Sequence, residues 1–584
     1  MLISAGHTEF AGPSLLVIEA AATLLGILVA FCWPRAGSVW FSKIERVFGR
    51  LAKRRVMSVV TVGLAALFVR LSILPVTPIP QPFIHDEFSY LLAGDTFASG
   101  RLTNPTHSMW KYFETFHVNQ QPTYMSMYFP AQGLVLAAGK VLMRHPWFGV
   151  WLSSGIMCSA ICWTLQGWLP PSWALLGGML AVMRLGLFTY WVNGYNGGAV
   201  AAIGGAFVLG VLPRLKRTGQ VRDFLLLALG IAILANSRPV EGLLVCVPAL
   251  LAVFWWVATK GRTAAPTLIR RSLPGVALLV VVAASMAYYN HRVFGNSFTL
   301  PYQTNRAMYA TAPVFLWLSP RAEPAYRYKV MRDFYTQAEL GDFQYARTLR
   351  GFFSRTGQKI GVVTFFIFGV ALMPPLLMLP WLLRDRRMTF LIAAGTVFGL
   401  GVSVNAWLFP HYVAPFAAGL YVILLQTMRH LRAWRPGGHP SGLFVVRTIP
   451  VICLMLVAVR VCAEPLNLTM NRWPAMWYGT KPLGLARARV LAQIENYPGR
   501  QLAIVRYAPE HQPFDDWVYN AADIDNSRAV WAREMDTGSA APELLQYFRN
   551  RRVWLVQPDA NPPMVSPYRM QDPGPMPHTT SSTR

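Results

Sequence analysis

The stretch Ile84-His85-Asp86-Glu87-Phe88-Ser89-Tyr90 decides how this chain is interpreted. It follows an apolar segment at residues 56–78, which is long enough to cross a lipid bilayer. Two adjacent carboxylates just beyond a membrane helix are costly in free energy, and ionisable groups in such places usually serve a function. The stretch opens a polar segment, residues 79–145, in a chain that is otherwise largely apolar. We therefore expect the functional residues to gather around it.

The composition indicates a polytopic membrane protein. The chain has 584 residues, of which 54% are hydrophobic and 14% are charged, whereas soluble domains carry about 25% charged residues. Its net charge of +27 would suggest nucleic-acid binding in a soluble protein. Here the cations lie in short segments between apolar stretches, which is the pattern that orients membrane helices. We therefore expect an integral, multi-pass membrane protein with no nucleic-acid partner.

Membrane helices need about 17–25 apolar residues, and by this measure the chain has about twelve candidate spans. They lie at residues 14–33, 56–78, 147–168, 171–192, 197–213, 223–236, 240–258, 273–289, 360–381, 388–408, 411–428 and 444–463. Pro374-Pro375 interrupts one of them, but kinks are tolerated inside helical bundles. The predicted fold class is mostly α: a membrane-spanning helical bundle followed by a small C-terminal α/β soluble domain.

The basic residues predict a single orientation for this bundle. Lys and Arg concentrate at residues 35–55, 214–222, 260–271, 384–387 and 429–435, which fall on one side if every span crosses. Positive charge marks the cytoplasmic side. The opposite side then receives the loops at 79–145 and 290–359 and the region from residue 464 onward. We expect the active site to face the periplasm or the cell exterior, in a bacterial inner membrane.

These boundaries divide the chain into four regions. Residues 1–55 hold an anchor span and a basic cytoplasmic segment; the span lacks the basic start of a signal peptide and carries Glu19, so we expect it to be retained. Residues 56–463 form the transmembrane domain. Residues 464–570 form the soluble α/β unit, with a helix at 485–496 and strands at 502–507, 529–532 and 553–556. Residues 571–584 have the composition of a disordered tail.

Asp86 is the candidate catalytic base, because a carboxylate can sit within hydrogen-bond reach of an acceptor nucleophile. Glu87 is the second candidate catalytic residue, although adjacent residues on a helix point about 100° apart, so only one can fully face a reacting centre. His85, Tyr90 and Asp95 are candidate substrate-binding residues, and Tyr90 shares the helix face of Asp86. The alternative is that Asp86 only caps a helix by accepting from backbone N–H groups.

The rest of the loop interleaves polar and aromatic side chains. His117 and Gln120 are its candidate substrate-binding residues, in a run that also holds Trp110 and Tyr124. Aromatic faces and polar groups together suit ligands that present both C–H patches and hydroxyls, as sugars do. The alternative is an amphipathic helix that lies on the membrane surface.

Arg238 is the one cation in the short outer loops. Its position runs against the rule that Lys and Arg gather on the cytoplasmic side. A guanidinium can bind phosphate oxygens bidentately, and the turn before the next helix would add backbone N–H groups. The alternative is a structural pair with Glu241, which is itself a candidate substrate-binding residue. Two more candidates are His411, at another outer helix end, and Tyr302, at the start of the second large loop.

These residues resemble the GT-C class of membrane glycosyltransferases, which includes protein O-mannosyltransferases and bacterial lipid A aminoarabinose transferases. Members have many spans and a first large outer loop that opens with an acidic pair, as Asp86-Glu87 does here, with Tyr90 following. The resemblance covers roughly residues 56–430 and implies a GT-C-like domain at 56–463. It also implies that Asp86 acts as base or positions the acceptor, and that the donor is a polyprenyl-phosphate sugar used on the outer face.

The resemblance leaves two matters open. The extra N-terminal span and the C-terminal unit differ from well-known members of the class, so the acceptor stays undefined. Some members use a divalent metal and others do not. Asp86, Glu87 and His117 could supply ligands, but no spacing fixes them, so the sequence assigns no cofactor with certainty.

We therefore expect a membrane glycosyltransferase that moves a sugar from a polyprenyl-phosphate donor to a lipid, glycan or protein acceptor. Its partners would be the lipid-linked donor, membrane lipid and an unknown acceptor. The alternative function is a transporter or flippase of a lipid-linked or polar substrate. Transporters place charged residues near the bilayer midplane and often have repeated halves. In this chain the ionisable groups crowd the outer interface and no clear repeat is visible, which favours the enzyme.

Overall fold

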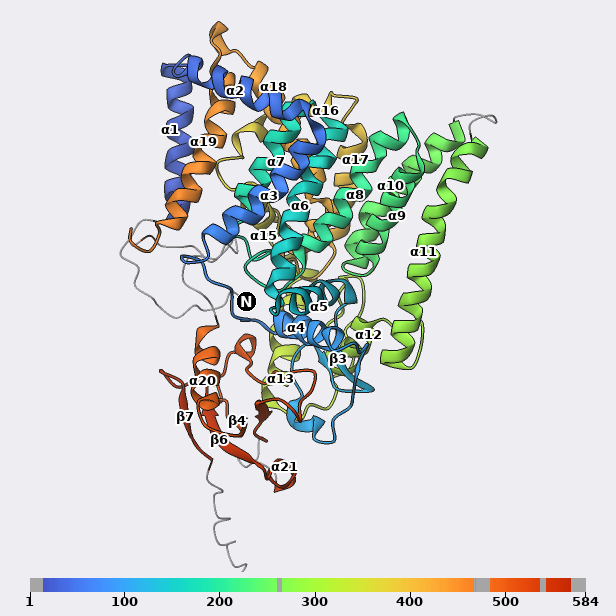
Figure 1. Cartoon of the computed structure of the whole chain (residues 1–584), viewed down its shortest axis with the longest axis vertical. Coiled ribbons are helices and arrows are strands. Elements are labelled where there is room, and N and C mark those ends of the chain that lie inside the picture. The colour runs from blue at the N-terminus through green and yellow to red at the C-terminus, as the bar shows by residue number, and fades with distance from the viewer. Residues whose placement is uncertain (1–13, 260–264, 467, 469–483, 536–541, 569–584) are drawn as a thin grey trace, which may run out of the picture.

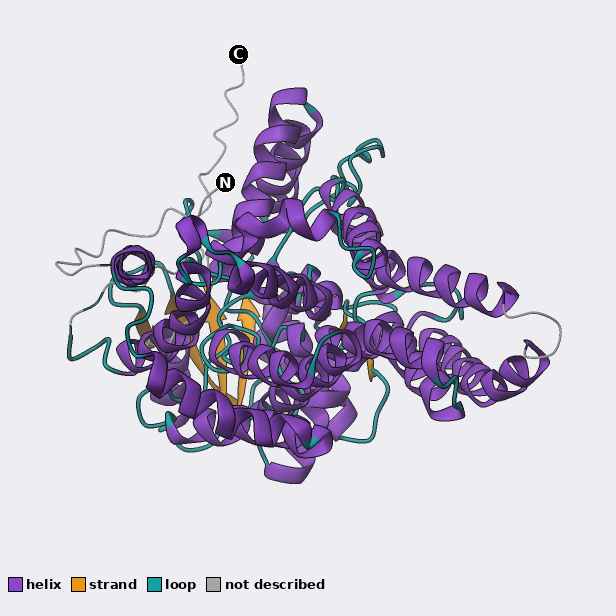
Figure 2. Cartoon of the chain, turned by 90° about the horizontal axis from the view of Figure 1, so that it is seen from above, coloured by secondary structure: helices purple, strands orange, loops and turns teal. Residues whose placement is uncertain are grey.

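The computed structural model describes residues 14–259, 265–466, 468, 484–535 and 542–568. Most helices run along the long axis of the molecule, and the C-terminal sheet lies at one end of the bundle that they form (Figure 1). Seen down on the bundle, the strands lie behind the helices (Figure 2). The predicted class, a helical membrane bundle with a small C-terminal α/β unit, is confirmed in this outline.

Among the described residues, seven helices are long and apolar enough to cross a membrane. They are α1 (Leu15–Cys32), α3 (Arg55–Ser72), α6 (Trp147–Trp168), α8 (Gly198–Arg217), α10 (Pro239–Thr259), α11 (Ala265–Phe294) and α19 (Ser441–Val461). Further helices complete the bundle: α7 (Pro171–Leu185), α9 (Val221–Ala235), α15 (Leu349–Ile367), α16 (Leu379–Leu383), α17 (Thr389–Ser403) and α18 (Ala417–Ala433). Every predicted stretch overlaps one of these helices, whereas the number of spans stays a prediction.

Two predicted spans are wrong in their extent. The stretch 360–381 is not one helix, because α15 ends at Ile367 and a 3-10 helix, η3, begins only at Pro374 (Pro374–Met378). The helix is closed by Gly369, which adopts a φ of +59° and donates its N–H to the carbonyls of Thr364 and Phe365. The stretch 171–192 is helical only to Leu185, and residues 186–197 form a buried loop that reaches the candidate site.

The bundle turns apolar side chains outward as well as inward. Leu24 on α1, Phe254 on α10 and Val280 on α11 are 61%, 73% and 63% exposed, and they belong to helices whose outer faces are apolar. Exposed apolar surface of this extent is unfavourable in water and is suited to contact with lipid tails. The chain is thus an integral membrane protein.

The N-terminal helix α1 is joined to the bundle by a buried ion pair. Glu19 accepts a 3.1 Å hydrogen bond from Nη1 of Arg184 on α7, and it also accepts from the backbone N–H of Ala371. Both charged side chains are about 5% exposed. Charges in such a place are retained only when they are paired. The extra N-terminal helix is therefore packed as part of the bundle.

The long loops fold into a layer at one end of the bundle. Its elements are α4 (His85–Ala98), β1 (Asn104–Pro105), η1 (Trp110–Phe113), β2 (Val118–Asn119), β3 (Thr123–Ser126), α5 (Pro130–Met143), α12 (Pro301–Tyr309), α13 (Lys329–Asp333), η2 (Phe334–Glu339) and α14 (Leu340–Arg347). The three short strands pair antiparallel in the order β1-β3-β2. α5 packs closely on α4 at Gly94, where a Cβ would lie 2.7 Å from that of Leu136.

The C-terminal unit has a four-stranded sheet in the order β5-β4-β6-β7. Strands β4 (Arg500–Val505), β5 (Ala529–Arg533) and β6 (Arg551–Gln557) are parallel, and β7 (Met564–Pro567) is antiparallel to β6. Helices α20 (Leu485–Glu495) and α21 (Pro542–Tyr547) accompany them. The predicted helix at 485–496 and all three predicted strands are confirmed. The predicted tail, residues 571–584, lies outside the described residues.

The two ends of the bundle differ in the way that the basic residues predict. α4, α5, α12 and the C-terminal sheet lie at one end, while α2 (Ser38–Lys53) and α16 lie at the other (Figure 1). α2 carries much of the basic segment at residues 35–55 and exposes apolar Trp40 and Ile44 beside its cations. The loops expected on one face are thus gathered together, away from that basic segment.

Candidate active site

The candidate site is built on the first turn of α4, which begins at His85 after Ile84 as N-cap. Asp86 and Glu87 both lie in that turn, where the helix dipole favours negative charge. The hydrogen bonds described for Asp86 come from side chains, whereas Glu87 accepts from backbone N–H groups. The alternative reading of Asp86 as a simple helix cap therefore does not fit its contacts.

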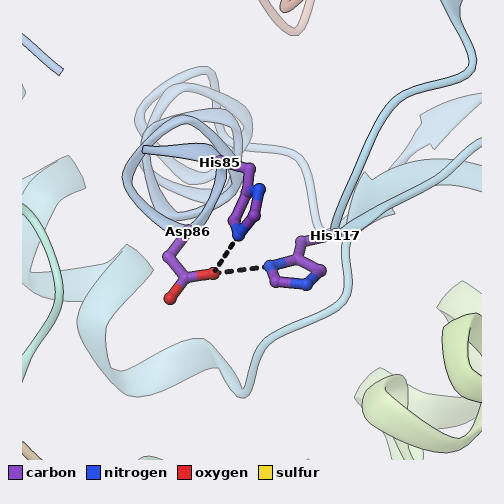
Figure 3. A group of neighbouring side chains, drawn as sticks. All are labelled: His85, Asp86 and His117. Carbon is purple, nitrogen blue, oxygen red and sulfur yellow. Dashed lines mark hydrogen bonds and ion pairs between the residues drawn. The ribbon is translucent and has the colours of Figure 1, made fainter. Parts of the chain in front are cut away.

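Asp86 is held by two side chains from later in the loop, His117 and Tyr128, and Figure 3 shows Asp86 with His117 and with His85. Its Oδ1 lies 2.5 Å from Nδ1 of His117 and accepts a 2.5 Å hydrogen bond from the hydroxyl of Tyr128. The hydroxyl of Tyr128 also lies 2.9 Å from Nδ1 of His117, and Nε2 of His85 is 3.8 Å from Oδ1 of Asp86. The Asp86 side chain keeps 17% exposure, so its carboxylate is oriented but still accessible.

His117 reaches Asp86 because its backbone adopts a rare conformation. Its φ is +60°, in the left-handed region that non-glycine residues seldom enter. Its carbonyl accepts hydrogen bonds from the hydroxyl of Ser89, at 2.6 Å, and from the N–H of Met127. Ser89 also shares a 2.7 Å hydrogen bond with Ser126. Residues in such conformations persist when their surroundings fix them, and they cluster at active sites.

The surroundings set the charge of this cluster. Burial alone would raise the pKa of Asp86, but the neighbouring His117 and the hydroxyl of Tyr128 stabilise the carboxylate and hold its pKa well below its usual range. Burial lowers the pKa of His85 to about 3, with a further contribution from His117. Asp86 is therefore an anion at neutral pH, and His85 is a neutral imidazole.

Glu87 makes a different set of contacts from Asp86. Its carboxylate accepts from the backbone N–H groups of Phe83 at 2.8 Å, Ile84 at 3.4 Å and Tyr195 at 3.0 Å. Gly194 leaves room for it, since a Cβ there would lie 2.5 Å from Oε1 of Glu87. Burial raises the pKa of Glu87 to about 7, against the effect of these hydrogen bonds. Glu87 thus anchors α4 to the loop at 186–197 and makes none of the hydrogen bonds that join Asp86, His117 and Tyr128, while its predicted catalytic role stays a prediction.

Arg238 lies beside the cluster, in a group of aromatic side chains. Its guanidinium is 4.3 Å from the ring centroid of Tyr412. Burial would lower the pKa of Arg238, but Tyr90, Tyr412 and Glu241 favour the cation and hold its pKa above the usual value. In the part of the chain that the structure describes, no ion pair within 4 Å joins Arg238 to Glu241. The alternative of a direct structural pair is therefore not what the structure contains.

Three further predicted residues surround the same place. Tyr90 stacks on Tyr128 with ring centroids 4.4 Å apart, and Tyr302 lies 6.5 Å from Tyr128. His411 is buried, and its Nδ1 is 2.7 Å from the hydroxyl of Tyr190. Burial lowers the pKa of His411, and the charges of both Arg238 and Asp86 act on it. The carboxylate, the guanidinium and the imidazole thus belong to one electrostatic neighbourhood.

Two predicted residues are not brought to this place. Asp95 pairs with Lys140 and accepts a 2.8 Å hydrogen bond from the N–H of Ala522, so it ties α4 to the C-terminal unit. Gln120 donates to the carbonyl of Phe113 at 2.6 Å and braces the loop from within. The contacts of both residues are structural ones, and their predicted substrate-binding roles stay predictions.

Sequence reasoning also missed residues that the fold contributes. Tyr128 binds Asp86, Ser89 and Ser126 fix the His117 segment, and Tyr190 and Tyr412 line the Arg238 group. Ser89 could have been found, since it lies within the opening stretch, one turn from Asp86. The others lie in separate segments and carry no pattern that distinguishes them from ordinary aromatic or polar residues.

One group of side chains has the composition of a metal site. Ligand atoms of His85, Asp86 and His117 lie within 4.8 Å of one another. Nδ1 of His85 has no hydrogen-bond partner among the described residues, and Nε2 of the same ring lies 3.8 Å from Oδ1 of Asp86. Two imidazoles and a carboxylate are donors that transition metals and zinc accept. The residues therefore fit a divalent ion.

No protein-family profile and no curated protein matches this chain. Solved structures with a similar fold include the oligosaccharyltransferase of Archaeoglobus fulgidus in complex with Zn and sulfate, at 10% identity and a TM-score of 0.48, covering 86% of this chain and 67% of that one. ArnT from Cupriavidus metallidurans bound to undecaprenyl phosphate is another, at 13% identity and a TM-score of 0.46, covering 86% of this chain and 92% of that one.

Both of these proteins are glycosyltransferases of the GT-C class, so the similar structures fall in the class that the opening stretch of the sequence resembles. With TM-scores of 0.48 and 0.46, these are similarities of fold.

Proposed function

We propose that this chain is a membrane glycosyltransferase that moves a sugar from a polyprenyl-phosphate donor to an acceptor on the outer face of the membrane. The observation that carries the proposal is that Asp86, a partly exposed carboxylate bound by Tyr128, and Arg238, a cation that makes no ion pair within 4 Å among the described residues, both lie near the stacked rings of Tyr90 and Tyr128. A sugar transfer from a lipid phosphate needs one group for the acceptor proton and one for the departing phosphate. This site offers both.

In the proposed reaction, an acceptor hydroxyl or amine attacks the anomeric carbon of the sugar. Asp86 takes the acceptor proton, held in place by His117 and Tyr128. The bond between the anomeric carbon and the phosphate oxygen breaks, and its electron pair leaves with the phosphate. Arg238 stabilises the charge that develops there, because a guanidinium binds phosphate oxygens with two parallel hydrogen bonds.

The surrounding side chains support the same assignment. Tyr412 holds the guanidinium of Arg238 by a cation–π contact, and Tyr90, Tyr302 and His411 provide ring faces and hydrogen-bonding groups for a sugar. The site lies at the end of apolar helices, so a polyprenyl tail could remain in lipid while its phosphate reaches Arg238. Glu87 acts in this proposal as a positioning residue for α4.

A divalent cation is part of the proposal as an optional component. His85, Asp86 and His117 would hold it, and its charge would help to neutralise the donor phosphate. Loss of activity in a chelator, with recovery on adding zinc or manganese, is the expected result if the cation takes part. His107→Ala is a control that should keep the same response to chelator and added metal as the wild type. His107 contacts Asp525 in the C-terminal unit and lies outside the group of His85, Asp86 and His117.

The test is sugar transfer by the purified protein in nanodiscs, with a panel of radiolabelled polyprenyl-phosphate sugars. The wild type should release sugar from one donor, and Asp86→Asn should lose this activity while keeping its melting temperature. Asp95→Asn is the matched control, because Asp95 lies on the same helix but binds Lys140 and Ala522 instead.

Normal transfer by Asp86→Asn would refute the proposed role of Asp86. No release by the wild type from any donor, with movement of a fluorescent lipid-linked sugar across the vesicle membrane, would support the alternative function as a flippase.

A further inference from the structure

A buried carboxylate of the C-terminal unit, Asp516, contacts the first outer loop near the candidate site. Asp516 follows β4 by eleven residues, and its side chain has no exposure to solvent. Oδ2 accepts a 2.6 Å hydrogen bond from Nη2 of Arg533, at the end of β5, and a 2.7 Å hydrogen bond from the hydroxyl of Thr115. Asp516 therefore joins the sheet of the C-terminal unit directly to the first outer loop.

Thr115 belongs to the segment that carries His117. Arg533 also binds this segment directly, because its Nε and Nη2 each donate a 3.3 Å hydrogen bond to the carbonyl oxygen of Glu114. Thr115 and Arg533 are both 2% exposed, so these contacts are closed to water. A charge-assisted hydrogen bond in such a place is stronger and less mobile than one at the surface.

The other side of the segment is held as well. The carboxylate of Glu114 accepts from the hydroxyl of Tyr309 at 3.0 Å and pairs with Arg327 at 3.0 Å, both from the second outer loop. The ring of Phe116 lies against that of Phe334, with centroids 4.8 Å apart. Residues 114–117 are thus clamped between the C-terminal unit and the second loop.

The last residue of the clamped segment, His117, has a backbone conformation that its surroundings must stabilise. His117 has a φ of +60°, a conformation that local sequence does not favour. A left-handed histidine keeps that geometry only while the neighbouring backbone is fixed. The neighbouring backbone is the segment at 114–116 that Asp516 and Arg533 hold.

We propose that Asp516 is a positioning residue of the catalytic site: with Arg533 it fixes residues 114–117, and so holds His117 against Asp86. The inference rests on the proposed function for its catalytic consequence. It gives the C-terminal unit a direct part in setting the geometry of the base, although none of its residues touches Asp86 in the contacts described above.

The experiment uses Thr115→Val, which removes the hydroxyl that binds Asp516 but leaves the Asp516–Arg533 pair intact. Thr115→Ser is the conservative variant that keeps the hydroxyl. Arg506→Gln is the matched control, because it breaks the Arg506–Glu534 ion pair in the same sheet without touching the clamped segment. Asp516→Asn, which removes the negative charge that binds both Thr115 and Arg533, is the fourth variant.

Hydrogen–deuterium exchange over residues 111–120 and steady-state kinetics are measured for each variant. Thr115→Val and Asp516→Asn should exchange faster over this segment and should lose kcat by about tenfold, with the donor KM little changed. Thr115→Ser should behave as wild type in both measurements. Arg506→Gln should lower the melting temperature and leave exchange of this segment and kcat unchanged.

Two results would overturn the inference. One is unchanged exchange over residues 111–120 in both Thr115→Val and Asp516→Asn. The other is faster exchange in an active enzyme whose kcat stays at the wild-type value. If the wild type transfers no sugar, the proposed function fails, while the exchange measurement still decides whether Asp516 holds the segment.

Discussion

The hydroxyl of Tyr128 donates a 2.5 Å hydrogen bond to Oδ1 of Asp86, although 42 residues separate them in the chain. Nδ1 of His117 lies at the same distance from the same oxygen. Both partners orient one oxygen of the carboxylate, and no described protein group is hydrogen-bonded to the other oxygen. This one-sided arrangement is the geometry that a general base needs, because one oxygen stays available to an incoming proton.

Tyr128→Phe tests this arrangement directly. The substitution keeps the ring that stacks on Tyr90 and removes only the hydroxyl bound to Asp86. A hydrogen bond to a charged group contributes about 1.5–3 kcal/mol, so kcat should fall by about 10- to 100-fold. Tyr124→Phe is the control, since its hydroxyl binds the carbonyl of Asn520 at 3.0 Å. Equal loss in both variants would contradict a specific role for Tyr128.

Glu87→Gln tests whether Glu87 anchors α4 or takes part in catalysis. An amide can accept on one side only, so it cannot satisfy all the backbone N–H groups that Glu87 binds. An unsatisfied buried donor costs about 1–3 kcal/mol, and the melting temperature should therefore fall. Residual transfer should nevertheless remain measurable below that temperature, unlike in Asp86→Asn. A fully inactive Glu87→Gln of wild-type stability would instead restore Glu87 as a catalytic residue.

Arg238→Ala should weaken binding of the donor phosphate. Loss of the guanidinium removes a charge-assisted contact, so the donor KM should rise by about tenfold or more. Arg238→Lys should recover only part of the affinity, because an ammonium cannot make two parallel hydrogen bonds. Arg222→Gln is the control: Arg222 is 74% exposed and lies in one of the basic segments. Binding of a short-chain polyprenyl phosphate, followed by calorimetry, checks the same prediction without turnover, and an unchanged affinity in Arg238→Ala would refute it.

Glu19→Gln should destabilise the attachment of α1. It leaves Arg184 without its buried carboxylate, and breaking a buried ion pair from one side costs about 3–5 kcal/mol. Glu45→Gln is the comparison, because Glu45 is 37% exposed and pairs with Arg447 near the surface, where such pairs contribute about 0–1 kcal/mol. Thermal unfolding in detergent should show a clearly larger loss for Glu19→Gln; equal losses would mean that the Glu19–Arg184 pair contributes little.

The sequence by itself determined the membrane class, the position of the basic segments and the loop that holds the candidate site. Apolar length and charge content are local properties, and a bilayer imposes them on any spanning helix. Alternation and β-branched residues were likewise enough to find three strands of the C-terminal unit, such as β4 (Arg500–Val505), although not β7 (Met564–Pro567). The position of Asp86 also followed from sequence, since its cost beside a membrane helix does not depend on its partners.

Only the tertiary structure decided which residues work with Asp86. Tyr128 and His117 come to it from later in the loop, and Glu87, its neighbour in sequence, turns to the backbone of Tyr195 instead. Adjacent side chains on a helix diverge by about 100°, so proximity in sequence says little about proximity in space. The clamp by Asp516 on Thr115 spans 401 positions of the chain. Contacts of that kind arise when separate elements pack together, and no local pattern in a single sequence encodes which elements will meet.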